Sequence, residues 1–416
     1  MTRKLVVTTF VKNLLGGGAE RVAVNLLQGL PQDVFTQELV MVSAWGPFLE
    51  QVPAHVPQTD LGLGHNVALA VPPLVRYLRR RRPDVLLSHL AHANVAAVTA
   101  ARLAGTGTRV VLVEHNDNSL LDAGRTRSLP SRALQGVKSA VYRQADLVVG
   151  VSHGVTDYVG RTFGVPAEKL RTVYNPVVSE TLLRRSHEPP PHPWFAPGEP
   201  PVLLASGRLR EQKDFSTLLR AFAAVRPVYR SRLIILGEGE LRSRLEAEIA
   251  ELGLGDAVAL PGFVPNPYAY MRAAALFALS SRWEGLPTVL VEAMACGTPV
   301  VATDCPSGPA EILEDGRLGR LVAVGDPGAL ARAILDELAD PTPLERLEAR
   351  AERFSFDTAI AAYTDLLAQR AWGAEPGEPP TLGVADEPFQ PTETRRSRRA
   401  GSAYRPTRKP EVRSHR

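Results

Sequence analysis

Short, largely apolar segments alternate with segments of helical periodicity along most of this chain, and the alternation restricts the fold more than any other feature. Segments such as Leu147–Val151 and Val202–Ala205 are almost entirely apolar, as expected for strands that are covered on both faces. Segments such as Phe215–Arg226 lie between the strands and place apolar residues at helical spacing. Because strands separated by helices pair in parallel, we predict an α/β fold built on doubly wound parallel sheets.

The alternation stops once and then begins again. Seven prolines fall within residues 189–201. Because proline fixes φ and lacks a backbone N–H, we expect residues 176–200 to form an extended hinge or linker. The parts on either side, residues 1–175 and 201–356, are of similar size. The sequence therefore predicts two α/β lobes joined by a proline-rich linker.

Beyond Trp372 the chain loses apolar periodicity and becomes rich in proline and charge, so we predict a disordered tail over residues 373–416. The tail is acidic at first, and its last part, residues 395–416, holds eight arginines and one lysine against a single acid. Without the tail, the formal charge of the chain falls from +4 to +1. A nearly neutral body does not require a broad nucleic-acid-binding face, and nucleic acid is not an expected partner.

The chain has only two cysteines, Cys296 and Cys305, which are too few for a disulfide framework or a metal cage. No run approaches the ~18 consecutive apolar residues of a membrane-spanning helix. The apolar stretch Leu5–Val11 is short for a signal peptide and is better explained as a first buried strand. We therefore expect a cytoplasmic protein.

The loops that follow the expected strands carry candidate binding residues, since ligands of doubly wound sheets bind beyond the carboxyl ends of the strands. After the first strand, Gly16–Arg21 (GGGAER) opens a helix, and its glycines would let backbone N–H groups approach an anion. In the second lobe, Arg208 and Lys213 lie on a loop that enters a helix, a natural place to neutralise phosphate. Taken singly, a flexible turn and a solvated basic loop explain these two segments at least equally well.

Residues 281–297 form the most specific segment of the chain. We expect a short helix that begins at Pro287, where the missing N–H costs nothing, and that leaves the next two amides free. Glu284 lies on the loop before this helix, and Glu292 interrupts its otherwise apolar sequence. A carboxylate in such surroundings needs either an ion-pair partner or a hydroxyl-rich ligand.

This segment is similar to a motif of a known enzyme family. Glu284 and Glu292, separated by seven residues in EGLPTVLVEAMACGTPVVATD, match the E-x7-E motif of the retaining GT-B glycosyltransferases of family 4. GGGAER, VYNPV and GRLREQKD resemble further segments of that family in the same order. DCPSGPAEILEDGRLGRLV resembles bacterial members that make lipopolysaccharide, capsule or lipid-linked glycans. The resemblance extends over roughly residues 1–370.

The resemblance implies the GT-B fold, in which two Rossmann-like lobes face a central cleft. It assigns acceptor binding to the N-terminal lobe (1–175) and nucleotide-sugar binding to the C-terminal lobe (201–356), and it implies a helix over residues 357–372 that crosses back to the N-terminal lobe. It also implies a retaining transfer of a sugar from a nucleoside-diphosphate sugar, with UDP favoured, to a glycan or lipid-linked acceptor in cell-surface polysaccharide synthesis.

The resemblance also implies roles for individual residues. The expected catalytic residues are Glu284, which would contact the donor sugar, and His115, which would lie near that sugar. The expected donor-binding residues are Arg208 and Lys213 for the diphosphate, Glu292 for the ribose hydroxyls, Phe263 for the base, and the backbone at Gly17, Gly18, Gly285, Leu286 and Thr288 for anionic groups.

We expect the transfer to need neither a metal ion nor a cofactor. Negative charge grows on the leaving diphosphate as its bond to the sugar breaks, and Arg208, Lys213 and a helix N-terminus would stabilise that charge. A divalent metal ion could do the same, but no Asp-x-Asp pair occurs in the chain. Retention would follow from attack on the front face of the sugar, with the leaving phosphate accepting the proton of the acceptor.

Two features are consistent with a peripheral location on the inner face of the cytoplasmic membrane. Apolar and basic residues mix in the first lobe, at Leu120, Leu121, Arg125, Arg127, Leu129, Arg132 and Lys138. The arginines of the tail would also be attracted to an anionic membrane surface, although solvated disorder explains the tail equally well.

Three alternative functions make different demands on the sequence. A nucleotide-sugar epimerase would need no separate acceptor, and the E-x7-E context argues against it. A non-catalytic, lipid-binding scaffold predicts the loss of Arg208, Lys213 or Glu292, and all three are present. Nucleic-acid binding through the tail predicts retention on DNA that falls steeply with salt.

Overall fold

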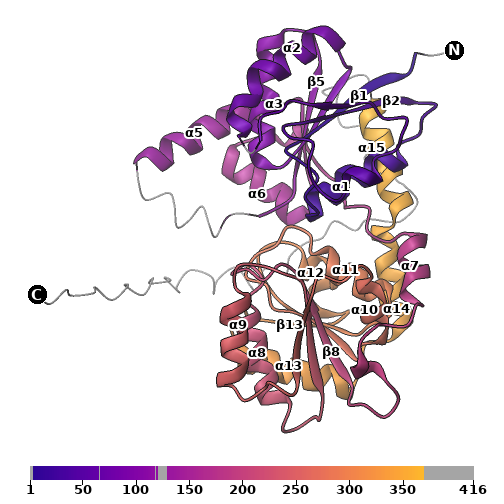
Figure 1. Cartoon of the computed structure of the whole chain (residues 1–416). Helices are drawn as coiled ribbons and strands as arrows, with labels where there is room; N and C mark the ends of the chain where they lie inside the picture. Colours follow the sequence, from indigo (N-terminus) through magenta and orange to yellow (C-terminus); the bar gives the residue numbers. More distant parts are fainter. Residues whose placement is uncertain (1–2, 65, 118, 120–128, 370–416) are drawn as a thin grey trace, which may run out of the picture. The chain divides into compact units, whose positions relative to one another are not determined.

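The computed structural model describes residues 3–64, 66–117, 119 and 129–369, and it contains two parallel β-sheets (Figure 1). The strands of the first sheet are β1 (Leu5–Val11), β2 (Phe35–Met41), β3 (Gln58–Asp60), β4 (Val85–His89), β5 (Arg109–Glu114), β6 (Leu147–Gly150) and β7 (Leu170–Thr172). Their spatial order is β3-β2-β1-β4-β5-β6-β7. The helices of this lobe are α1 (Gly18–Gly29), α2 (Val71–Arg81), α3 (Ala91–Ala104), α5 (Leu129–Arg143) and α6 (His153–Phe163).

The second sheet repeats the same plan with six strands. These are β8 (Val202–Ser206), β9 (Arg232–Leu236), β10 (Val258–Gly262), β11 (Leu276–Leu279), β12 (Val300–Thr303) and β13 (Arg320–Val322). Their spatial order is β10-β9-β8-β11-β12-β13. The helices of this lobe are α8 (Phe215–Val225), α9 (Arg242–Glu251), α10 (Pro267–Ala273), α11 (Thr288–Ala295), α12 (Pro309–Ile312) and α13 (Pro327–Ala339). The predicted fold class of two Rossmann-like parallel-sheet lobes is confirmed.

Both sheets reverse their strand order beside their first strand. β1 lies between β2 and β4, and β8 lies between β9 and β11. The loops that follow β1 and β8 therefore lie at the two topological switch points, where open α/β sheets bind their ligands. These are the loops that carry the glycine-rich segment and the basic segment of the sequence.

The expectation of an extended linker over residues 176–200 is wrong for its first half. Residues Glu180–Ser186 form helix α7, and the hydroxyl oxygen of Ser179 caps it by accepting a hydrogen bond from the amide of Leu182 at 3.2 Å. The prolines of this segment begin only at Pro189, so they do not interrupt the helix. A Ser N-cap outweighs the overall proline content. The boundaries assigned to the linker and lobes stay predictions.

Helix α11 begins one residue later than expected. Pro287 has ψ near 90°, which is not helical, so it is the N-cap and Thr288 is the first helical residue. No side chain caps this end. Among the described residues, the amides of Thr288 and Val289 have no hydrogen-bond partner. The expected pair of free amides is therefore present despite the shift.

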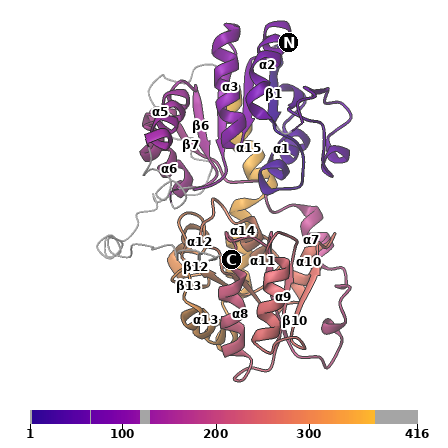
Figure 2. The same ribbon diagram turned by 60° about the vertical axis from the view of Figure 1, so that its left-hand side comes forward.

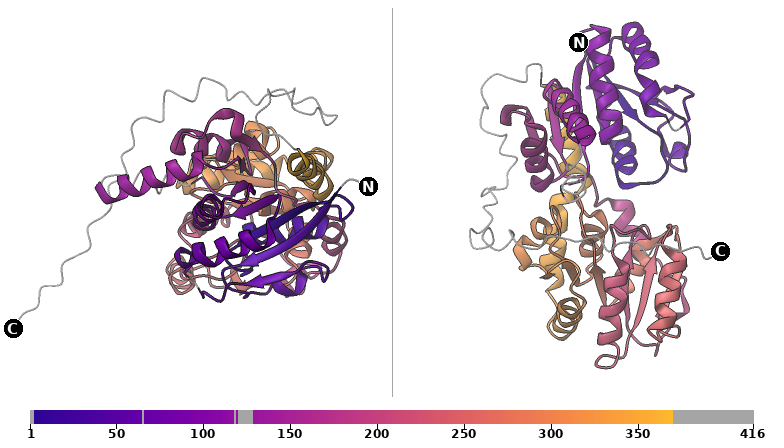
Figure 3. Two further views of the ribbon diagram at one scale, coloured as in Figure 1. Left: turned by 90° about the horizontal axis from the view of Figure 1, so that it is seen from above. Right: turned by 90° about the vertical axis from the view of Figure 1, so that its left-hand side faces the viewer.

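The last two described helices are α14 (Leu344–Ala351) and α15 (Phe356–Ala368). α15, drawn in yellow, lies beside α1 of the first lobe (Figure 2). Figure 3 shows the same ribbon from above and from the side. Gly29 at the end of α1 makes this close approach possible, because a Cβ there would collide with Ile360. The guanidinium of Arg109 also donates a hydrogen bond to the carbonyl of Leu367 at 3.4 Å.

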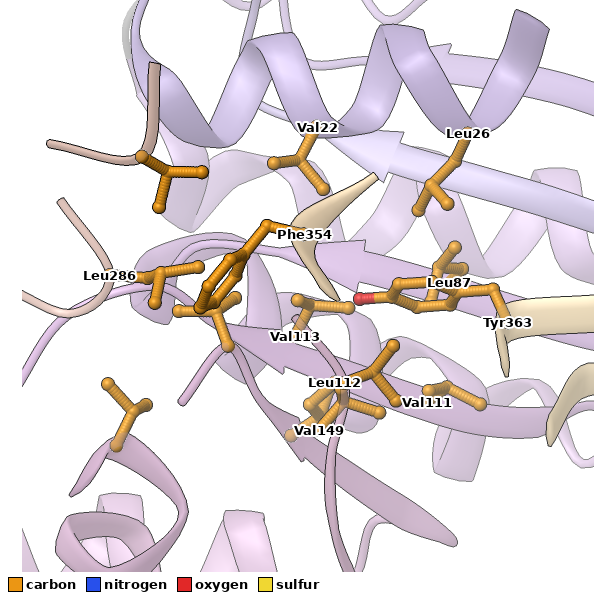
Figure 4. Close-up of a cluster of buried hydrophobic side chains, with 14 of the residues drawn as sticks. Val22, Leu26, Leu87, Val111, Leu112, Val113, Val149, Leu286, Phe354 and Tyr363 are labelled. Carbon is orange, nitrogen blue, oxygen red and sulfur yellow. The ribbon is translucent and has the colours of Figure 1, made fainter. Parts of the chain in front are cut away.

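One hydrophobic cluster combines residues of both lobes (Figure 4). Val113 and Val149 come from the first sheet, Leu286 comes from the loop before α11, and Phe354 and Tyr363 come from the C-terminal segment. Burying each such side chain contributes roughly 1.5–3 kcal/mol. Because its side chain belongs to this core, Leu286 can offer a ligand only its backbone.

None of the helices in the described part of the chain has the length and apolar character that crossing a bilayer requires. Within the same part, no group of three or more His, Cys, Asp or Glu side chains is arranged to hold a metal ion. Most of the predicted basic and apolar membrane segment, residues 120–128, and the predicted tail lie outside the described residues.

Candidate active site

The glycine-rich loop after β1 lies against Arg208 of the other lobe. A Cβ placed on Gly17 would lie 3.2 Å from Nη2 of Arg208 and would collide with the carboxylate of Glu20. Gly18 begins α1, has no atom near the position of a Cβ, and is not covered by a capping side chain. Arg208 is exposed, and no ion pair or hydrogen bond of its guanidinium is present among the described residues. The structure therefore brings the predicted residues Gly17, Gly18 and Arg208 together.

Lys213 and Glu284 form a buried ion pair. Nζ of Lys213 lies 2.6 Å from Oε1 of Glu284, and the two side chains are only 15% and 7% exposed. The hydroxyl of Ser281 donates to the same oxygen at 2.6 Å, and the amide of Gln212 lies 3.5 Å from the second oxygen. Lys213, predicted to bind the diphosphate, and Glu284, predicted to contact the sugar, are thus each other's partners in the structure. Buried charges of this kind need such a partner.

Glu292 lies on α11 and contrasts with Glu284. No hydrogen bond or ion pair of its carboxylate is present in the described part of the chain. Burial raises the pKa of Glu292 to about 7, although the positive charges of Arg21 and Lys213 act in the opposite direction. A half-buried carboxylate without a partner and with a strongly shifted pKa is typical of a ligand site.

Two residues near Glu292 were missed by the sequence reasoning. The charge of Glu292 is the largest cause of the raised pKa of Tyr268, a residue of α10. Arg21 of α1 interacts electrostatically with both, while its guanidinium stacks 3.7 Å from the centre of the Phe48 ring. Arg21 belongs to the quoted GGGAER segment, so a signal was present, but its charge could not be assigned a partner without the fold.

Gly285 is fixed by hydrogen bonds from both lobes. Its carbonyl accepts hydrogen bonds from the hydroxyls of Ser152 and Ser307, each at 2.9 Å. It also forms an isolated antiparallel β-bridge with Asn116. A Cβ on Gly285 would collide with the carbonyl oxygen of His115. Only glycine permits this approach, so the backbone places Gly285 beside the end of β5.

His115 lies directly after β5 and is only 8% exposed. Its Nε2 is 3.1 Å from Nδ1 of His89, the last residue of β4. Burial lowers the pKa of His115 to about 3, so the imidazole is neutral. His89 was not among the site residues predicted from the sequence, because only the pairing of β4 with β5 brings it beside His115.

Phe263 follows β10 and is 80% exposed, which is unusual for a large aromatic side chain. The carbonyl of Gly262, which precedes it, accepts a hydrogen bond from the amide of Gly237 at 2.8 Å. Gly237 follows β9, so Phe263 lies at the carboxyl edge of the second sheet, and its role at the base stays a prediction.

These groups are suited to binding an anion that carries hydroxyl groups. Arg208 and the free amides at the start of α11 favour negative charge. Glu292 can accept hydrogen bonds from hydroxyls. The neutral imidazole of His115 can donate a hydrogen bond to an uncharged polar group or accept one from it.

Two family models match the chain. Residues 16–181 match the model described as Glycosyltransferase Family 4, and residues 191–354 match the model described as Glycosyl transferases group 1. Together they include the glycine-rich loop of the first lobe and all the charged residues described above.

Among the curated relatives, the Campylobacter jejuni N-acetylgalactosamine-N,N'-diacetylbacillosaminyl-diphospho-undecaprenol 4-alpha-N-acetylgalactosaminyltransferase is 29% identical over 348 residues, covering 80% of this chain and 89% of the relative. The amylovoran biosynthesis glycosyltransferase AmsD of Erwinia amylovora is 26% identical, covering 76% of this chain and 84% of the relative. Among solved structures, Anabaena HepE in complex with UDP has a TM-score of 0.69 at 23% identity, covering 88% of this chain and 100% of the other. This last similarity shows the fold.

Proposed function

The chain belongs to the family 4 glycosyltransferases, and on this premise we propose that it transfers a sugar, with retention of configuration, from a UDP-sugar to a glycan or lipid-linked acceptor in cell-surface polysaccharide synthesis. The observation that carries the proposal is the carboxylate of Glu292, which is half-buried, has a pKa raised to about 7, and has no partner in the described part of the chain. A group held in this state favours a ligand that brings hydroxyl donors.

In this proposal the donor binds along the carboxyl edge of the second sheet. The hydroxyls of the ribose donate hydrogen bonds to Glu292, and Arg208 pairs with the diphosphate. The free amides of Thr288 and Val289 add to the positive field at the diphosphate. The exposed ring of Phe263 stacks on the base. We propose uracil as the base because HepE was solved with UDP, and this support comes from the similarity alone.

The bond that breaks joins the anomeric carbon to a phosphate oxygen. Negative charge grows on the departing diphosphate and positive charge on the sugar ring. Arg208 and the start of α11 stabilise the first without an ion, so we propose that the transfer is independent of metal. Lys213, which pairs with Glu284 in the structure, also interacts with the diphosphate. The carboxylate of Glu284 then stabilises the positive charge on the sugar ring. The oxygen of the acceptor hydroxyl forms the new bond to the anomeric carbon, on the face that the diphosphate leaves, and the departing phosphate accepts the proton of that hydroxyl.

The acceptor is proposed as a glycan or a lipid-linked saccharide bound by the first lobe. Support comes from the Campylobacter jejuni relative, whose name describes a diphospho-undecaprenol-linked acceptor. An acceptor of that kind would place the chain at the inner face of the cytoplasmic membrane, and flotation with anionic vesicles tests this location.

A thermal-shift panel tests the donor. A ligand that binds only the folded chain stabilises it by about 2.7 kcal/mol at a concentration one hundred times its dissociation constant. We expect UDP-sugars to raise the melting temperature in EDTA as much as in magnesium, and GDP- and ADP-sugars to raise it less. A shift that appears only with magnesium would contradict metal independence, and no shift with any nucleotide sugar would contradict the proposed donor site.

A further inference from the structure

The pairing of β4 with β5 places two histidines in contact. His89 is the last residue of β4 and pairs with Val113 of β5. His115 lies two residues after Val113, directly beyond the end of β5. The two imidazole rings stack with centroids 5.3 Å apart and an interplanar angle of 28°. Nδ1 of His89 and Nε2 of His115 are 3.1 Å apart, which is a hydrogen-bond distance. His89 is completely enclosed, whereas His115 keeps a small exposed fraction.

Only one hydrogen can lie between these two nitrogens. Burial lowers the pKa of both imidazoles, and the charge of His115 lowers that of His89 further, so both rings are neutral near neutral pH. Each neutral imidazole carries its single hydrogen on one of its two nitrogens. The hydrogen bond between the rings therefore links the tautomer of His115 to that of His89.

Two arrangements satisfy the contact, and they differ at the far nitrogen of His89. If Nε2 of His115 donates, His89 must carry its hydrogen on its own Nε2. That nitrogen is buried and has no hydrogen-bond partner in the described structure, so a buried N–H would be left without an acceptor. If Nδ1 of His89 donates instead, the enclosed Nε2 of His89 is an unpaired acceptor and not an unpaired donor. Buried N–H groups without a partner are the rarer of the two in native proteins.

The remaining nitrogen of His115 is the one available to a ligand. Nδ1 of His115 has no hydrogen-bond partner among the described residues, yet it is not enclosed as the far nitrogen of His89 is. When His89 donates to Nε2, the hydrogen of His115 lies on this Nδ1. The neutral ring then carries a hydrogen-bond donor at Nδ1, on the residue that precedes Asn116, whose backbone forms the bridge with Gly285.

We propose that His89 is a positioning residue that fixes His115 as the Nδ1–H tautomer, so that His115 offers a hydrogen-bond donor, and not a base, to an oxygen of the donor sugar. The part of this inference that concerns the sugar rests on the proposed function. The part that concerns the tautomer rests on the two rings alone. A fixed donor orients the sugar and leaves the removal of the acceptor's proton to another group.

Nitrogen NMR of the full chain labelled with ¹⁵N-histidine tests the tautomer directly. The spectra of His115→Asn and His89→Asn assign the two rings among the nine histidines. We expect Nδ1 of His115 to show the shift of a protonated nitrogen and Nε2 that of an unprotonated one. The reverse pattern, averaged shifts or a protonated ring at pH 7 would overturn the proposal.

Two variants of His89 test the positioning role by kinetics. The side-chain amide of His89→Asn keeps a donor near the place of Nδ1, whereas His89→Leu keeps only bulk. We expect His89→Leu to lower kcat about tenfold, as the loss of one hydrogen bond would, and His89→Asn to stay within about threefold of the parent. A folded His89→Leu variant with the parent kcat would overturn the proposal.

The NMR and the kinetic experiments test the two parts of the proposal independently. If His89→Leu does not fold, the NMR spectra of the parent and of His89→Asn still decide the tautomer. If the parent transfers no sugar from any nucleotide donor, the proposed function is wrong, while the NMR result still confirms or overturns the tautomer.

Discussion

The carboxyl edges of the two sheets occupy equivalent positions in the fold but carry different chemistry. The edge of the first sheet presents glycine amides and two buried, neutral histidines, His89 and His115. The edge of the second sheet presents charged groups, namely the exposed Arg208, the Lys213–Glu284 pair and the unpaired Glu292. The difference favours the proposed arrangement, in which the diphosphate of the donor is bound mainly by the second lobe and His115 faces an uncharged part of the sugar.

The same contrast separates the two glutamates of the second lobe. Glu284 has three partners on its two oxygens, from Lys213, Ser281 and Gln212. Glu292, eight positions later, has none in the described part of the chain. A carboxylate with partners can be buried at little net cost, while one without partners lowers stability and gains from a ligand.

The largest effect is expected from Lys213→Met. Removing one partner of a buried pair leaves Glu284 uncompensated, which costs about 3–5 kcal/mol of unfolding free energy. Turnover should fall as well, because the diphosphate loses a cation. Urea unfolding and transfer assays on the same samples measure the two losses.

The double variant Lys213→Met/Glu284→Gln is the control for that experiment. We expect it to recover most of the stability, since no buried charge remains, but not the turnover. Recovery of turnover together with stability would mean that the pair is only structural.

The next largest effect is expected from Glu292→Gln, which should raise the stability of the fold but weaken donor binding. The pKa of Glu292 is raised from 4.5 to about 7, so the carboxylate destabilises the ligand-free fold once it ionises. The unfolding free energies of variant and parent should therefore be equal below pH 4.5. Between pH 4.5 and 7 the parent loses stability relative to the variant, and above pH 7 the variant stays more stable by at most about 3 kcal/mol. Its affinity for the donor should fall.

Urea unfolding at pH 4 and pH 8 measures this gain. Glu251→Gln is the matched control, because Glu251 is exposed at the end of α9 and has no ion pair among the described residues. A Glu292→Gln variant that is less stable than the parent at pH 8 would show that the carboxylate has a partner in the free chain.

Arg208→Ala is expected to affect activity without affecting stability. A charge-assisted hydrogen bond contributes about 1.5–3 kcal/mol, so kcat/KM should fall about ten- to a hundredfold. The melting temperature should not change, because the side chain is exposed and has no ion pair in the described structure. Arg210→Ala, which breaks only the exposed pair with Glu240, is the control and should leave kcat/KM unchanged.

Phe263→Ala is expected to have the smallest effect. Loss of a stacking surface of about 1 kcal/mol should weaken UDP binding about fivefold and leave stability unchanged, because the ring is 80% exposed. Val228→Ala, at another exposed apolar side chain, is the control. Equal UDP affinity in both variants, measured by calorimetry, would remove Phe263 from the base site.

The sequence predicts the fold well where the local signal is strong. The strands around Leu147–Gly150 and Val202–Ser206 are continuous apolar runs, so their burial on both faces could be expected. The three-residue strands β3 and β7 are polar or mixed and gave no such signal. Helix α7 was missed because the prolines that follow it dominated the composition of the segment.

The site is predicted less completely, because its contacts join distant parts of the chain. The segments GRLREQKD and E-x7-E identify Lys213 and Glu284 as site residues. The two residues are 71 positions apart, and nothing in either segment shows that they form an ion pair. The spacing of Glu284 and Glu292 likewise gives no sign that only one of them has partners. These are tertiary properties that follow from strand order.

The most direct test compares UDP with 2′,3′-dideoxy-UDP by calorimetry, on the parent chain and on Glu292→Gln. The account predicts that the parent binds UDP more tightly, because the ribose hydroxyls donate to Glu292, and that the variant binds both nucleotides equally. A parent chain that does not distinguish the two nucleotides, or a variant that keeps the full difference, would contradict the placement of the donor on the charged edge of the second lobe.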